Sequence, residues 1–379
     1  MHSIRMPAQP GDISNNSPRC APGVCLFEVI CLLNERNQAI INAIIEKAEK
    51  KYPGVLALIG IYGSFQTGDI HEKSDLDLMI VINDDMGWGL GCTFIQDDLN
   101  VGHDIYCTTW ESLANDAGFS HPNIAKLMDS RIVYCADEKY MERLSALREE
   151  ARKRIESPVS ADDIEAARAQ LRDAEHYFSL AMSAELLPEI RGNAGGVIYH
   201  AENIAALLNK RYFRFGMKRA YQELKAMPQC PEGFTDIIEN VVAADTRTAL
   251  KESLTELMGV LQEMFFSFRK DVENSMNIEG TYEEMFSNWR NKMYLAAELS
   301  DKHMAFMCMT NAQAMLDDIF AENDIGKYDV MAGYDPHDLL KTAQAFDDLL
   351  ESYRKEYDKA GTKVRRYADI YEFARAYKE

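Results

Sequence analysis

One stretch of the sequence, residues 61–82 (IYGSFQTGDIHEKSDLDLMIVI), constrains the fold more than any other. Its pattern predicts a strand, a Gly-Ser turn, a polar loop and a second strand that carries Asp75 and Asp77. Because side chains alternate along a strand, the two carboxylates share one face and lie about 7 Å apart along the backbone. Two acids among Leu, Met, Ile and Val destabilise a fold unless something binds them. A divalent cation with a phosphate behind it would do so.

The pattern changes along the 379 residues, which are enough for two or three domains. Residues 1–24 mix Pro, Gly, Ser and Asn without periodicity, which predicts a disordered leader. Residues 25–156 alternate amphipathic helices with short apolar strands, so we predict an α+β domain with a small mixed β-sheet. No strand pattern follows Ser157-Pro158, and the rest is predicted to be all-α, a helical-bundle region that divides into residues 157–272 and residues 273–379.

Two further segments give specific structural expectations. Residues 101–108 alternate between apolar and polar side chains, which predicts a third strand with Asp104 aligned toward the same cleft as Asp75 and Asp77. In the helical part, the glycine-rich run 192–196 is predicted to interrupt a helical pattern, with a new helix starting at Val197.

Composition excludes several classes of protein. The eight cysteines are scattered without CxxC pairs, which indicates reduced thiols in a cytoplasmic protein and no disulfide frame or zinc site. No apolar run approaches the roughly 18 residues of a membrane span, and the opening lacks the pattern of an export signal. A net charge of −20 argues against nucleic-acid binding. It is compatible with a cationic substrate, although an acidic surface more commonly serves solubility.

The carboxylates and the Gly-Ser turn together suit nucleotidyl transfer. That chemistry needs a polyphosphate held by backbone N–H groups and one or two Mg²⁺ ions held by oxygen ligands. Gly63 and Ser64 suit the first task, because glycine lets the backbone approach a phosphate and the Ser64 hydroxyl donates to its oxygens. Asp75, Asp77 and Asp104 suit the second as metal ligands.

The pattern G-S-x₁₀-D-x-D, followed by an acid on a later strand, resembles the polymerase-β nucleotidyltransferase superfamily. Within it, the chain is similar to the antibiotic nucleotidyltransferases of the kanamycin type over about residues 55–270. The similarity is strong in the motif, where SDLDLMIV matches the second strand, and residues 101–114 match the strand with the third acid. It is looser in residues 193–270, which include AENIAALLNKRYF and resemble the family's helical substrate-binding domain.

The resemblance also implies a general base and shows two departures. In that family a glutamate on the first helix of the second domain takes the acceptor's proton, and the matching position is Glu175; Glu202 is the rival candidate. Many relatives place an arginine near Thr67 to touch the triphosphate, and a lysine where this chain has Ser179. Lys73 is then the nearest basic residue in sequence for the phosphates.

The function that the resemblance implies is an Mg²⁺-dependent transfer of a nucleoside monophosphate, AMP from ATP, to a hydroxyl of a small molecule. The acceptor would be an aminoglycoside-like, cationic antibiotic. Two alternatives remain open: AMP transfer to a protein partner, as in antitoxin-like relatives, and a non-catalytic nucleotide-sensing protein. Kanamycin-type relatives share a site between two subunits, so the protein is expected to be a homodimer, or a monomer whose C-terminal extension replaces the second subunit.

Overall fold

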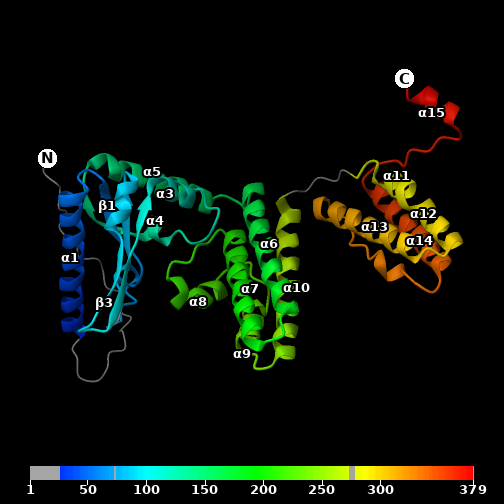
Figure 1. The fold of residues 1–379 in the computed structure, drawn as a ribbon. Helices are drawn as coiled ribbons and strands as arrows, with labels where there is room; N and C mark the ends of the chain where they lie inside the picture. Colours follow the sequence, from blue (N-terminus) through cyan, green and yellow to red (C-terminus); the bar gives the residue numbers. More distant parts are fainter. Residues whose placement is uncertain (1–25, 72–73, 273–277, 324, 379) are drawn as a thin grey trace. The chain divides into compact units, whose positions relative to one another are not determined.

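A computed structural model describes residues 26–71, 74–272, 278–323 and 325–378. The predicted leader, residues 1–24, and Lys73 lie outside this described part. The chain divides into two compact units, Met1–Phe265 and Phe266–Glu379. Mixed α/β structure is confined to the first part of the first unit and the remainder is helical, which confirms the predicted fold class (Figure 1).

Among the described residues, four strands form the main sheet in the order β5-β2-β1-β6. β1 pairs antiparallel with β2 and β6, whereas β2 pairs parallel with β5, so the sheet is mixed as predicted. The strands are β1 (Leu56–Ile61), β2 (Leu78–Ile82), β5 (Cys107–Thr109) and β6 (Arg131–Cys135).

Both faces of this sheet are buried because each carries apolar side chains against helices. In β2, Leu78, Ile80 and Ile82 join the core cluster that includes residues of α1 (Leu26–Lys51). The alternate residues Met79 and Val81 join the second cluster, on the face covered by three further helices. Those helices are α3 (Trp110–Ala117), α4 (Ala125–Asp129) and α5 (Glu138–Glu156). Two buried faces explain why β2 reads as a continuous apolar run.

A separate two-stranded sheet holds Asp104. It consists of β3 (Cys92–Gln96) and β4 (Val101–Ile105), in which Thr93 lies opposite Asp104. The predicted single strand over residues 101–108 is therefore wrong: the chain changes sheets at Tyr106, and Cys107 then pairs beside Ile80. Alternation survives the change because β4 still buries every second residue, so periodicity alone cannot reveal it.

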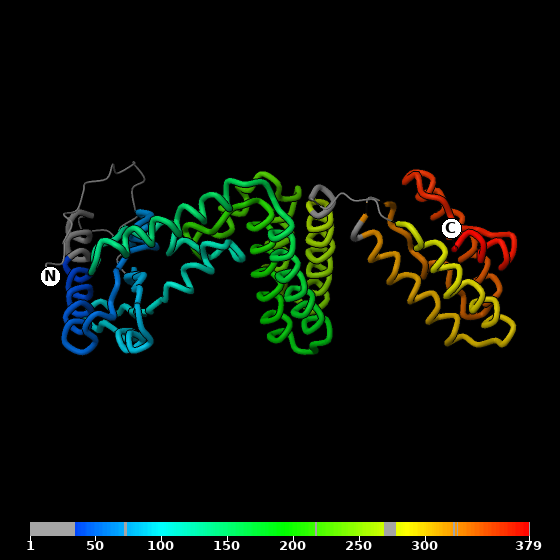
Figure 2. Tube along the Cα trace, turned by 90° about the horizontal axis from the view of Figure 1, so that it is seen from above, coloured from blue at the N-terminus to red at the C-terminus, as the bar shows by residue number. Residues whose placement is uncertain are grey.

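Long helices build the rest of the first unit. α6 (Ala161–Ser183) packs along α7 (Leu187–Leu208), and α8 (Ala220–Lys225), α9 (Phe234–Ala243) and α10 (Arg247–Val272) follow (Figure 2). The prediction that residues 192–196 break the helix is wrong, because α7 continues through them. A Cβ at Gly196 would come within 2.5 Å of the Tyr177 ring, so this glycine allows α6 and α7 to approach closely.

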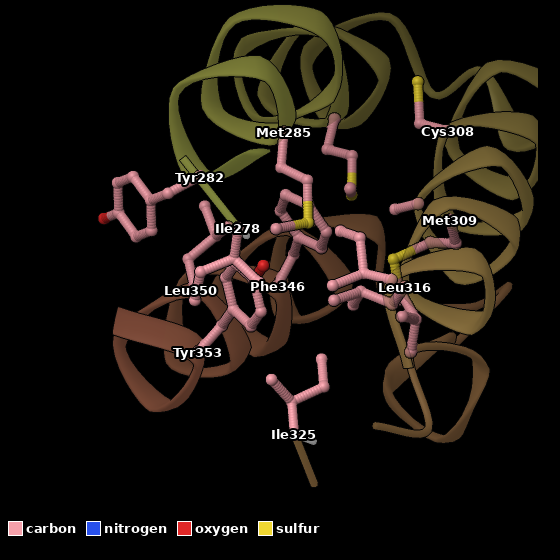
Figure 3. Packing of buried hydrophobic residues seen from close by; sticks show 14 of the residues in the cluster. Ile278, Tyr282, Met285, Cys308, Met309, Leu316, Ile325, Phe346, Leu350 and Tyr353 are labelled. Carbon is pink, nitrogen blue, oxygen red and sulfur yellow. The ribbon is translucent and has the colours of Figure 1, made fainter. Parts of the chain in front are cut away.

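The second unit is a helical bundle around one apolar core. Figure 3 shows Met285, Leu316 and Phe346 pointing into that core together with Tyr353. Its helices are α11 (Thr281–Met285), a π-helical turn at Phe286–Arg290, α12 (Asn291–Leu299), α13 (Lys302–Glu322), α14 (Leu339–Lys359) and α15 (Ile370–Ala376). Within the described residues of both units, no helix has the length and apolar character that crossing a membrane requires.

Candidate active site

The turn after β1 places a glycine where the chain requires one. Gly63 has φ of 65°, a left-handed conformation that disfavours residues with a Cβ, and it precedes the short helical turn α2 (Ser64–Thr67). A Cβ at this position would also overlap the carboxylate of Asp77. The side chain of Asp77 therefore lies directly against the backbone of the Gly-Ser turn.

Asp75 and Asp77 lie in the extended segment just before β2, not within the strand as predicted. The strand begins at Leu78 because that residue pairs with Ile61, the last residue of the antiparallel neighbour β1. Alternation nevertheless persists: Leu76 is buried and the two acids are half-buried. The Tyr62 N–H donates to the Asp77 carbonyl over 3.1 Å, so the segment stays attached to the end of β1.

The environment of Asp77 disfavours an uncompensated negative charge. Burial and the neighbouring Asp75 raise the pKa of Asp77 to about 6. The positive charge of Lys218 and a hydrogen bond from the Ser64 N–H act in the opposite direction. A carboxylate that is desolvated beside a like charge is the kind of group that a bound cation stabilises.

Tyr62 connects the third acid to this pair. Burial raises the pKa of the Tyr62 phenol to about 12, and negative charge on Asp77, Asp75 and Asp104 adds to the effect. All three carboxylates thus lie near one phenol, although Asp104 belongs to the separate β3–β4 sheet and is exposed.

The residues present fit a divalent cation in part. Within the described part of the chain, no group of three or more His, Cys, Asp or Glu side chains is arranged to hold a metal ion. Asp75 and Asp77 together supply a two-carboxylate site, and Mg²⁺ characteristically binds one or two carboxylates plus substrate phosphates and water. The Ser64 hydroxyl is buried and lacks a hydrogen-bond partner, which leaves it free to bind a phosphate oxygen.

Two cationic segments that sequence reasoning missed approach these acids. Arg219 binds Asp69 with two hydrogen bonds, of 2.8 Å from Nε and 2.6 Å from Nη2. Lys218, the preceding residue, lies near enough to lower the pKa of Asp69 as well as that of Asp77. These partners are 150 residues apart in sequence, and no local motif marks such a contact.

Arg36 on α1 is the second cation. Its Nη2 donates to the Ser74 carbonyl over 2.8 Å, and its guanidinium lies 5.8 Å from the Phe65 ring centroid. Asp75 opposes the effect of burial on the Arg36 pKa, which places the two charges near each other. Arg36 belongs to the helical part of residues 25–156, where the sequence pattern could not show which loop this arginine contacts.

Glu175, the predicted base, lies on α6 and contacts α10. Its side chain is exposed and accepts a 3.0 Å hydrogen bond from Gln262 on α10. Ala166, by contrast, packs against the core cluster beneath the sheet. The two residues are about two and a half turns apart on α6, so they lie on opposite sides of the helix.

Glu202, the rival candidate, lies on a different face. It is half-buried on α7, and burial raises its pKa to about 7. Tyr199, one turn earlier, accepts a 3.2 Å hydrogen bond from Asn123, and Leu207 packs in the core beneath the sheet. Residues three apart on a helix are neighbours, so Glu202 lies beside Tyr199, which contacts Asn123 of the α+β domain.

The sequence and the structure are each similar to known proteins over part of their length. Residues 41–104 match the model of the nucleotidyltransferase domain family, a segment that ends at Asp104 and includes the turn and both other acids. The structure resembles a nucleotidyltransferase-like protein from Exiguobacterium sibiricum with a TM-score of 0.37 and 11% sequence identity, covering 75% of this chain and 90% of that one. No protein of curated function matches the chain significantly by sequence.

Proposed function

We propose that the protein, whose residues 41–104 match the nucleotidyltransferase domain family, transfers a nucleoside monophosphate, AMP from ATP, to a hydroxyl of a small molecule. The observation that carries the proposal is the packing of the Asp77 carboxylate against Gly63, with Ser64 beside it. This contact brings a carboxylate that could bind a metal ion next to a turn that could bind a phosphate.

The nucleotide side of the site is formed by residues close in sequence. Asp75 and Asp77 would hold Mg²⁺, with Asp104 completing the set, and a bound Mg²⁺ would supply charge neutralisation at the phosphates. The unpartnered Ser64 hydroxyl would donate to a β- or γ-phosphate oxygen. Because little covalent chemistry is needed, catalysis depends on positioning and on electrostatic stabilisation.

We assign the general base to Glu202 in preference to Glu175. As the acceptor oxygen attacks the α-phosphorus, its proton would pass to the Glu202 carboxylate, and the bond to pyrophosphate would break. A carboxyl pKa of about 7 suits this role near neutral pH, because the group is both ionised in part and basic enough. The exposed Glu175, bound to Gln262, would instead support the contact between α6 and α10.

The acceptor proposed is a cationic, hydroxyl-bearing compound of the aminoglycoside type. The net charge of −20 supports it, since a negative field attracts polycations, and so does the sequence resemblance to kanamycin-type enzymes. Residues 157–272 would select this acceptor.

A transfer assay tests the proposal. Purified protein is mixed with Mg²⁺, each of the four nucleoside triphosphates and a panel of aminoglycosides, and pyrophosphate release is measured. We expect turnover with ATP that Asp77→Asn abolishes. Asp98→Asn, which removes one exposed charge from the β3–β4 turn, serves as the matched control and should retain activity. Transfer only to a protein hydroxyl would replace the acceptor class, and ATP binding without pyrophosphate release for any acceptor would reject enzymatic function.

A further inference from the structure

The Gly-Ser turn and α2 carry none of the cations that a bound triphosphate needs. Residues 63–71 contain no lysine or arginine, and Lys73 is the first basic residue that follows them in the sequence. The acids near the turn, Asp69, Asp75 and Asp77, add further negative charge. Polyphosphates bind where fixed positive groups offset such charge, and a cation from another part of the chain would add to that of Lys73.

The segment just before α8 reaches the turn and is fixed there. The Arg219 guanidinium forms its two hydrogen bonds with Asp69, the residue that follows Gly68 at the end of α2. On its other side, Arg219 lies 5.6 Å from the ring centroid of Phe215. A two-point contact between planar groups restrains orientation as well as position, so the backbone at residues 216–219 is held beside the turn.

Lys218 is the cation in this segment that remains available. Its side chain is exposed, and it has no ion-pair partner within 4 Å among the described residues, whereas it acts electrostatically on both Asp69 and Asp77. Of the two other cations that the structure describes near the turn, Arg219 binds Asp69, and Arg36 donates through Nη2 to the Ser74 carbonyl while its Nη1 has no hydrogen-bond partner.

We propose that Lys218, on the helical side of the first unit, binds the β- and γ-phosphates of the nucleotide and then the departing pyrophosphate. This inference rests on the proposed nucleotidyl transfer. The ammonium would donate hydrogen bonds to non-bridging phosphate oxygens and stabilise the negative charge that grows on the leaving group as the bond to the α-phosphorus breaks. Arg219 is the positioning residue that holds Lys218 in place. Lys218 thereby supplies the positive charge that residues 63–71 lack.

Calorimetric binding to the full chain in the presence of Mg²⁺ tests this role. Dissociation constants are measured for ATP, inorganic tripolyphosphate and AMP with Lys218→Ala, Lys218→Arg and Lys225→Ala. Lys225 is the matched control because it belongs to the same region but contacts Tyr221 instead of the acids. We expect Lys218→Ala to weaken ATP and tripolyphosphate binding about 10- to 100-fold, as loss of a charged hydrogen bond does. AMP binding should be unchanged, Lys218→Arg should restore most of the loss, and Lys225→Ala should have no effect.

The outcomes separate this inference from the proposed function. If the wild type binds ATP but Lys218→Ala binds tripolyphosphate equally well, or loses AMP to the same extent, the role of Lys218 is refuted and the proposed function stands. If the wild type binds neither ATP nor tripolyphosphate, both fail. A double-mutant cycle adds the role of Arg219: Arg219→Ala should weaken tripolyphosphate binding in the wild-type background and have little further effect in Lys218→Ala. Additive losses would show that Arg219 does not act through Lys218.

Discussion

Replacing Glu202 by Gln should stabilise the protein in a way that grows with pH. The folded-state pKa of Glu202 is raised from 4.5 to about 7 because burial disfavours its charged form. Below pH 4.5 the carboxyl is protonated in both the folded and the unfolded chain, so it does not destabilise the fold. Between pH 4.5 and 7 the folded state holds the extra proton, and the free energy of unfolding therefore falls as pH rises.

The size of the effect follows from the shift in pKa. Each pKa unit corresponds to about 1.36 kcal/mol, so a rise from 4.5 to about 7 corresponds to about 3 kcal/mol as an upper limit. Glu202 is only half-buried, and solvent screening reduces the value to about 1–2 kcal/mol. Gln has nearly the same shape without a charge. The stability difference between Glu202→Gln and the wild type should thus grow from near zero at pH 4.5 to about 1–2 kcal/mol at pH 8.

Urea denaturation between pH 4.5 and 8, followed by tryptophan fluorescence, measures this difference. Both proteins carry Trp289→Phe, so that the signal comes from the first unit, where Trp110 is buried in the core with Leu207. Glu175→Gln, at an exposed position, is the matched control and should show no growth with pH. A flat difference for Glu202→Gln as well would mean that its carboxylate is fully solvated, and the reason for choosing Glu202 as the base would be lost.

Three further predictions concern the chemistry. The rate of transfer should rise about 10-fold per pH unit well below pH 7 and level off above it. Glu202→Gln should lower the rate about 10²- to 10⁴-fold and remove this dependence on pH. Initial rates measured across pH check both expectations, and an unchanged profile in the variant would exclude Glu202 as the base. Gly63→Ala should abolish transfer and lower the free energy of unfolding by about 1–3 kcal/mol, because φ is 65° and the new Cβ overlaps Asp77; equal activity and stability would contradict the geometry of the turn. Ser64→Ala should leave stability within about 0.5 kcal/mol, because its hydroxyl has no protein partner, yet weaken ATP binding about 10-fold; a calorimetric titration that shows undiminished affinity would remove Ser64 from the phosphate site.

Local sequence patterns predicted the sheet better than they predicted its connections. β1 and β2 read as apolar runs because both faces of the main sheet are covered. Nothing in the sequence indicated that the chain changes sheets at Tyr106. The alternation of apolar and polar residues continues from β4 into β5, although β4 pairs with β3 and β5 pairs with β2. The glycines at 192–196 suggested a break because glycine disfavours helices, but packing against Tyr177 determines the structure there.

In the candidate site as well, the sequence revealed the residues that lie close together in the chain but not those that come from distant parts of it. Asp75, Asp77 and the Gly-Ser turn lie within 15 residues of one another, so the sequence alone identified them as a motif for nucleotidyl transfer. Lys218 and Arg36 reach the site from other parts of the chain, where only tertiary structure selects them. For the two glutamates, the sequence pattern indicated helices but not which helix face meets the sheet.

The fate of the phosphates tests the central claim, nucleotidyl transfer, most directly. ATP labelled either at the α-phosphate or at the γ-phosphate is incubated with the protein, Mg²⁺ and the acceptor, and the products are separated. We predict that the α label appears on the acceptor, that the γ label appears in pyrophosphate in equal amount, and that Asp77→Asn stops both. Appearance of the γ label on the acceptor would instead show phosphoryl transfer and contradict the account.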